Sequence, residues 1–362
     1  MELLLFWSGE RRGEYGRLGV LMGVISAMIF FTRQTSIGIP VAIVLYLVVA
    51  RWRIGEMKRM WRELGSMVIG GLLVVVPLVV YLTLNQALLE FWDAAFVFNM
   101  VYIGERGMLN RFVALWSGFR ALMPSGLILF AGLGWTAIIW QLIKKHELPL
   151  GIKPMLLLAG ILLPVEVGLV SLGGRPRIPY FVTLLPTLGL LSGYLGWLVY
   201  AQLANRKINP GAITGMLLLG LAALNWNAYL AGIADSHTDE GMGEVVNFVE
   251  THSGPGDYVL MIGAETAVNF HALRRSPSRY VYQYPLYRGG YTDDIELASF
   301  FEDILNKQPR IIIVALEGGE IPNRFGPNKT AESEALTHEI NSLYAPVEEF
   351  GNGWVAYESL LD

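Results

Sequence analysis

Six arginines are the residues of this sequence best suited to chemistry, because the predicted topology places them outside, against the positive-inside bias, and the set contains no lysine. A guanidinium is a planar fork of N–H donors that binds a phosphate through two hydrogen bonds, whereas an ammonium acts as a point charge. A group of such arginines suits a phosphorylated lipid or sugar. The six are Arg33, Arg106, Arg111, Arg120, Arg175 and Arg177.

Arg33 is the single charge in the apolar run Leu18–Ala50, which is 33 residues long. A helix of that length would reach about 50 Å, whereas the hydrocarbon core of a bilayer is about 30 Å thick. The run therefore predicts a helical hairpin that turns at 32–36. Thr35 and Ser36 are expected to be the N-caps of its second helix, and Arg33 and Gln34 are candidates for binding the phosphate near the positive end of that helix.

Arg33 has a second interpretation, which the sequence leaves open. An arginine at membrane depth is costly, and it can instead snorkel to the interface or pair with an acid. Glu166 is the acid within a predicted span. It could be the counter-ion of Arg33 or an acid that handles protons.

The segment GGRPRIPYF, Gly173–Phe181, holds two of the arginines between prolines directly before an apolar run. Arg175, Arg177 and Tyr180 are therefore predicted to bind the phosphate as well. The alternative is an interfacial anchor, with the tyrosine in the aromatic belt at the membrane surface.

The aromatic, amphipathic segment Ala87–Met108 is too interrupted to cross a membrane and is expected to lie along its surface. Four of its side chains offer hydrogen-bonding groups that a sugar or an acceptor would need. They are Asn99, Tyr102, Glu105 and Arg106. A purely interfacial helix is the other interpretation.

The elements that must position these residues are membrane spans. The sequence is 53% hydrophobic and only 16% charged, and it contains 10 Trp and 16 Tyr, which is typical of a membrane protein. Besides the two arms of the hairpin, apolar windows run over five ranges, giving a prediction of about seven spans. The five are 66–84, 122–143, 155–172, 180–200 and 212–230.

Charge placement predicts which side of the membrane each loop occupies. Basic residues concentrate at 51–62, 144–153 and 206–207, and the positive-inside rule assigns such loops to the cytoplasm. Alternation of the spans then places the hairpin tip, the loops that carry the six arginines and everything after Ile233 outside. The prediction is a multi-pass protein of the plasma (inner) membrane with an extracytoplasmic C-terminal domain.

The composition changes at about residue 233: residues 233–362 have 21 acidic and 8 basic residues, whereas residues 1–232 have 10 and 19. We therefore expect a transmembrane helical domain at 1–232 and a small soluble α/β domain at 233–362. Strands are predicted at 257–263 and 309–315, a helix between them and a hairpin around 351–353. The fold class is mainly α, a polytopic helical bundle followed by that domain.

The sequence excludes several kinds of chemistry. It has no Cys, so disulfides, thiolate catalysis and Cys-ligated metal sites are ruled out. The five His are scattered, without metal-ligand spacing, and no dinucleotide or P-loop fingerprint is present. No cofactor is indicated, a divalent metal is left open, and no nucleic-acid partner is expected.

Four segments together carry a family resemblance: FFTRQTSIGIP, FNMVYIG, RPRIPYFVTLLPTLGLLSG and SPSRYVYQYP. The chain resembles bacterial membrane glycosyltransferases of the GT-C superfamily, in particular the protein-mannosyltransferase-like and aminoarabinose-transferase-like group. The similarity corresponds to the C-terminal portion of such an enzyme.

The resemblance implies an inverting transfer of a sugar from a polyprenyl-phosphate carrier to a lipid, glycan or protein acceptor outside the membrane, among the surrounding membrane lipids. It places Arg33 and Gln34 at a basic step of the family, and Arg175, Arg177 and Tyr180 in the late outer loop above the carrier. The family's catalytic acids lie in a first outer loop that has no counterpart here, so the catalytic residues are unknown and this chain alone is expected to lack its general base. The alternative function is a non-catalytic lipid-phosphate-binding protein or a transporter.

Overall fold

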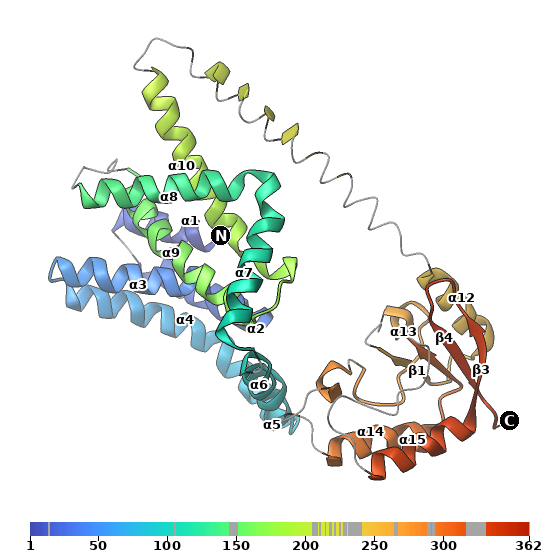
Figure 1. The fold of residues 1–362 in the computed structure, drawn as a ribbon. Helices are drawn as coiled ribbons and strands as arrows, with labels where there is room; N and C mark the ends of the chain where they lie inside the picture. The colour runs from blue at the N-terminus through green and yellow to red at the C-terminus, as the bar shows by residue number, and fades with distance from the viewer. Residues whose placement is uncertain are drawn as a thin grey trace. The chain divides into compact units, whose positions relative to one another are not determined.

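The fold is taken from a computed structural model that describes residues 1–13, 15–104, 106–144, 151–204, 241–263, 267–281, 283–287, 291, 294–315 and 331–361, and scattered positions between 209 and 230. The chain divides into two compact units (Figure 1). They are Met1–Ala95 with Ile103–Tyr229, and Phe96–Tyr102 with Leu230–Asp362.

The first unit is helical. Its longer helices are α1 (Glu2–Arg12), α2 (Gly16–Thr32), α3 (Gly38–Arg53), α4 (Met57–Leu84), α7 (Met108–Leu122), α8 (Leu127–Ile143), α9 (Lys153–Ser171) and α10 (Leu185–Ala204). Shorter turns of helix connect them: η1 (Gln34–Ser36), α5 (Leu88–Trp92), the π-helical η2 (Asp93–Val97), α6 (Phe98–Gly104), η3 (Met123–Ser125) and η4 (Ile178–Leu184).

Several of these helices are long and apolar enough to cross a membrane, as expected for a membrane protein. In the part of the chain that is described there are four, or up to five if one bent pair counts as a single span. The four are Gln34–Arg53, Met57–Leu84, Lys153–Ser171 and Pro179–Ala204. The seven predicted spans are therefore not confirmed.

Three predicted spans are not among the four helices that could cross a membrane. The first arm of the hairpin, α2, is only 17 residues long. The window 122–143 lies in a helix pair, Met108–Ser125 and Leu127–Ile143, which bends by 101° where Pro124 and the left-handed Gly126 interrupt the helix. The window 212–230 lies mostly outside the described residues.

The break in the apolar run at Arg33 is where the sequence predicts it. α2 ends at Thr32, Arg33 has an extended backbone, and α3 begins at Gly38. The predicted caps are wrong, however: the N-cap of α3 is Ile37, and Thr35 and Ser36 lie in the preceding 3-10 turn. α2 packs along α4, and α3 packs against α9 and α4; Figure 1 shows α3 and α4 side by side.

The packing of α2 on α4 depends on small residues at i, i+4 spacing on both helices. A Cβ added at Gly23 would overlap the carbonyl oxygen of Met67, and one at Gly70 would overlap the carbonyl oxygen of Val20. Gly19 meets Ser66 in the same way. Helices in a membrane gain van der Waals contact by such close approach, so these contacts hold the first half of α2 against α4.

The second unit contains a mixed four-stranded sheet of order β1-β2-β4-β3. β1 and β2 are parallel, and β2–β4 and β4–β3 are antiparallel. The predicted strands, the helix α14 between them and the hairpin are all present. The strands are β1 (Val259–Ile262), β2 (Ile311–Val314), β3 (Tyr344–Glu349) and β4 (Val355–Ser359), and the helices are α12 (Met242–His252), α13 (Ala267–His271), α14 (Asp294–Lys307) and α15 (Ala331–Leu343), with the 3-10 turn η5 (Tyr284–Tyr287).

Helices cover both faces of this sheet. Leu260 and Ile312 face one core with Phe300 of α14, on the side where α14 and α15 lie together (Figure 1). Met261 and Ile313 face the other core, with the side chains of α12 and α13. β1 and β2 are buried on both faces, which explains their continuous apolar sequences.

Candidate functional site

The loop between α9 and η4, which carries Arg175 and Arg177, is the point that Arg33, Arg106 and Arg111 approach. Arg33 reaches it from the end of α2, 146 residues away in sequence. Its Nη1 donates a hydrogen bond to the carbonyl oxygen of Pro179 at 3.0 Å, and its guanidinium lies 5.2 Å from the ring centroid of Tyr180. Arg33 is half-buried there, and among the described residues it forms no ion pair.

Two more arginines approach the same loop from the start of α7. Gly174 has a left-handed backbone, and a Cβ added to it would lie 2.8 Å from Cβ of Arg106 and 3.6 Å from Cγ of Arg111. Only glycine leaves room for both side chains at this point. The Nε atom of Arg111 is buried and has no hydrogen-bond partner in the described structure, which is an expensive state for a charged donor unless a ligand completes it.

The loop is held by its own backbone hydrogen bonds. The amide of Gly174 donates to the carbonyl of Ser171 at 3.0 Å, that of Arg177 to Arg175 at 2.9 Å and that of Tyr180 to Arg177 at 3.0 Å. Arg175 is buried, whereas Arg177 is exposed. The positions of these arginines are therefore fixed by backbone that is already ordered, which favours binding without a large entropic cost.

One aromatic residue anchors the loop to the helical bundle. Phe181 is almost fully buried, and its ring occupies the space where a side chain at Gly118 of α7 would be. Phe119 contacts the same ring edge-on, with centroids 6.1 Å apart. The contact fixes η4 against the helix that carries Arg111.

Glu166 is not the counter-ion of Arg33. It is buried in α9, where its Oε2 accepts a hydrogen bond from the hydroxyl of Thr187 at 2.6 Å, and its Cγ fills the space beside Gly38. The partners of Arg33 are Pro179 and Tyr180 instead. This leaves the guanidinium without a neutralising carboxylate in the described part of the chain.

The remaining predicted site residues are placed differently. Gln34 donates from Nε2 to the carbonyl oxygen of Ala95 at 2.7 Å, so it tethers the π-helical turn η2 to the hairpin tip. Asn99 and Tyr102 lie on the part of α6 that belongs to the second unit. Glu105 lies outside the described residues, and Arg120 is exposed near the far end of α7. Sugar or acceptor binding at residues 99–106 stays a prediction.

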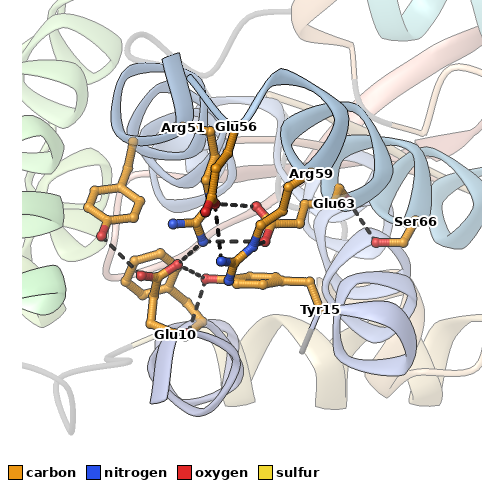
Figure 2. A network of polar contacts seen from close by, with 9 residues as sticks. Glu10, Tyr15, Arg51, Glu56, Arg59, Glu63 and Ser66 are labelled. Atoms are coloured by element: carbon orange, nitrogen blue, oxygen red, sulfur yellow. Dashed lines mark hydrogen bonds and ion pairs between the residues drawn. The ribbon is translucent and has the colours of Figure 1, made fainter. Parts of the chain in front are cut away.

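A second polar cluster, which the sequence did not predict, lies at the other end of α2 (Figure 2). Arg51 is buried between two carboxylates: it pairs with Glu10, and its Nε donates to Glu63 at 2.9 Å. Arg59 also donates to Glu63, at 2.8 Å. We call Glu10, Tyr15, Tyr46, Arg51, Arg59 and Glu63 the α1–α4 network.

The two tyrosines of the α1–α4 network both donate to Glu10, Tyr15 at 2.9 Å and Tyr46 at 3.2 Å. Burial, and then the neighbouring Glu10 carboxylate, raises the pKa of the Tyr15 phenol above its ordinary value. The network joins α1, α3 and α4 by buried, mutually satisfied charges, so it is a structural element. Its one sequence signal was the presence of Glu10 and Glu63 beside loops rich in arginine.

Comparison with known proteins does not identify the chain. No family model matches it, and no curated protein matches it. In the described residues no group of three or more His, Asp or Glu is placed to hold a metal ion. We call residues 172–177, between α9 and η4, the arginine loop. Together with Arg33, Arg106 and Arg111, it offers guanidinium donors that can bind an anion.

Proposed function

We propose that this chain belongs to a membrane glycosyltransferase that takes a sugar from a polyprenyl-phosphate donor and passes it to an extracytoplasmic acceptor. The observation that carries the proposal is the convergence of Arg33, Arg106 and Arg111 on the ordered loop that contains Arg175 and Arg177. A phosphate that joins a lipid to a sugar is an anion that such a loop can hold at the membrane surface.

The arginines also fit the bond that the reaction breaks. The acceptor hydroxyl attacks the anomeric carbon of the sugar, the bond from that carbon to the phosphate oxygen breaks, and the electron pair leaves with the polyprenyl phosphate. The donor is a phosphodiester with one negative charge, and the departing polyprenyl phosphate gains a second, so positive charge beside the phosphate stabilises the leaving group more than the donor and lowers the barrier. The acceptor proton goes to a general base, and we assign no residue of this chain to that role.

Arg111 is the arginine whose side chain most needs a ligand in this proposal. Its buried Nε has no hydrogen-bond partner, and a phosphate oxygen would supply one. In this proposal Arg33 contacts the same phosphate, and the ring of Tyr180 holds its guanidinium in place.

The experiment measures consumption of a polyprenyl-phosphate-linked hexose by membranes that contain the full chain, with empty-vector membranes as the baseline. Arg111→Gln and Arg33→Leu are each expected to lower the rate about 100-fold, the usual effect of removing one donor from an anion-stabilising site. Arg120→Gln is the matched control, because it removes an exposed arginine from the same helix, about 13 Å along its axis from Arg111.

A donor that is consumed at equal rates by the wild type and by well-folded Arg111→Gln and Arg33→Leu variants would contradict the proposal. Consumption no faster than in empty-vector membranes, combined with tight binding of polyprenyl phosphate, would favour the second function, a non-catalytic lipid-phosphate-binding protein or transporter. That function is kept because no catalytic base is assigned.

A further inference from the structure

A cavity of about 1240 Å³ opens beside the α1–α4 network, at the end of α2 opposite Arg33. It is bordered by the end of α1, the start of α2 and the α3–α4 connection, at residues 12–13, 15–18, 55–59 and 62–63. α2 has 17 residues, so this cavity lies about 25 Å along the helix from the arginine loop.

The cavity carries an excess of positive charge. Four exposed cations line it and form no ion pair within the described part of the chain: Arg12, Arg17, Lys58 and Arg62. The carboxylates that line it in the described chain are already engaged, because Glu56 and Glu63 both pair with Arg59. The free charges therefore attract an anion.

The cavity lies at the level where apolar helix surface begins. Leu18, the first residue of the apolar run, is part of its lining. Trp61 on the first turns of α4 is 66% exposed, as is typical of a tryptophan at a membrane interface. An anion bound here would be at the depth of the phospholipid headgroups.

An exposed apolar track continues from the cavity along α4. Ile69 and Leu73 follow Arg62 at i+7 and i+11, which places all three on one face of the helix. Ile69 is 57% and Leu73 61% exposed. A soluble anion would not contact this apolar track, whereas the acyl chain of a lipid would cover it.

We propose that this cavity binds the headgroup of an anionic phospholipid, with the phosphodiester held by Arg17, Lys58 and Arg62 and an acyl chain lying along Ile69 and Leu73 of α4. Basic pockets between membrane helices bind anionic headgroups by the same combination of charge and apolar surface. The site does not depend on the proposed sugar transfer and would be occupied in a protein without that activity.

The test compares two variants of the full chain that lose equal charge. The cavity variant carries Arg12→Gln, Arg17→Gln, Lys58→Gln and Arg62→Gln; the control variant carries Arg11→Gln, Arg53→Gln, Lys144→Gln and Lys153→Gln, which do not line the cavity. Retention of phosphatidylglycerol against phosphatidylcholine is measured by native mass spectrometry of detergent-purified protein. A third variant, Ile69→Ser with Leu73→Ser, tests the acyl track without a change of charge.

Wild-type and control proteins are expected to retain phosphatidylglycerol, and the cavity variant to bind it about tenfold or more weakly. The Ile69→Ser, Leu73→Ser variant should also lose retention, while glycerol phosphate at the same concentration should compete poorly. Equal loss in the cavity and control variants would overturn the proposal, because it would mean general charge attraction. Full competition by glycerol phosphate would also overturn it, because the site would then bind a soluble anion.

Discussion

Arg51 lies near the end of α3 and Arg33 lies shortly before its start. The two arginines differ in whether a carboxylate neutralises their charge. Arg51 is buried between Glu10 and Glu63, and its charge is neutralised by both. Arg33 is half-buried against a carbonyl oxygen and the ring of Tyr180, with no ion pair in the described chain.

The difference separates an arginine that stabilises the fold from one that is available to a ligand. A buried arginine with two carboxylates satisfies its donors internally, and removing Arg51 would leave the Glu10 carboxylate buried without a cation. An arginine whose partners are a carbonyl and an aromatic face keeps its net charge, so it adds positive potential to the loop. Arg111, with its buried and unpartnered Nε, belongs to the second kind.

The largest expected effect is the loss of Arg51. Arg51→Met leaves the buried Glu10 without a cation and Glu63 with Arg59 alone, and it should lower the free energy of unfolding by about 3–5 kcal/mol. Thermal unfolding in detergent measures the change, with the exposed Arg53→Met as the control from the same helix end.

A rescue makes this prediction sharper. Arg51→Met combined with Glu63→Leu and Glu10→Leu replaces the charged contacts by apolar ones, and it should recover most of the lost stability. Unfolding of Arg51→Met at the wild-type temperature would show that the α1–α4 network is not structural, and the contrast with Arg33 would fail.

The second effect concerns the helix that connects the two arginine sites. Gly23→Leu places a side chain against the carbonyl of Met67, and the resulting overpacking should cost about 1–3 kcal/mol. The shift of α2 should also weaken donor binding at Arg33. Gly65→Leu on α4 is the control, since a Cβ there meets nothing within 4 Å; equal effects of the two changes would contradict the close α2–α4 contact.

The smallest of the stability effects is expected at Tyr15. Tyr15→Phe removes the hydrogen bond to the Glu10 carboxylate, which keeps Tyr46 and Arg51 as partners, so the change should cost about 0.5–1.5 kcal/mol at neutral pH. Because the pKa of the phenol is raised in the folded protein, its contribution is complete below the ordinary tyrosine pKa near 10 and is lost above it. Above pH 10 the free energy of unfolding of the wild type should therefore fall more steeply with pH than that of Tyr15→Phe. Parallel pH profiles would exclude a role for Tyr15 in the network.

Local patterns made much of the fold predictable. The α/β elements follow from short β-branched runs such as residues 311–314, and the break at Arg33 follows from a run too long for one span. The bend at Pro124 and Gly126 was missed because apolar residues flank it on both sides, and mean hydropathy does not register a change of helix direction.

The sites were predictable in part and for a clear reason. Charge placement identified which arginines have no evident structural use, but spacing along the chain does not show that Arg33 reaches Pro179 or that Glu63 turns toward Arg51. Those contacts come from tertiary packing between helices far apart in sequence. The same limit applied to Glu166, whose partner Thr187 lies on another helix.

The central claim is that the arginine loop binds a lipid-linked phosphate, and the most direct measurement is equilibrium binding of polyprenyl phosphate to the full chain in nanodiscs. This ligand is the product common to every donor sugar, so the test does not require the sugar to be known. Arg33→Leu and Arg111→Gln should each weaken binding by about 10-fold to 100-fold, as expected for one charged hydrogen-bonding group, while Arg120→Gln and wild type bind alike. Wild-type affinity in both Arg33→Leu and Arg111→Gln, with monodisperse protein, would contradict the claim.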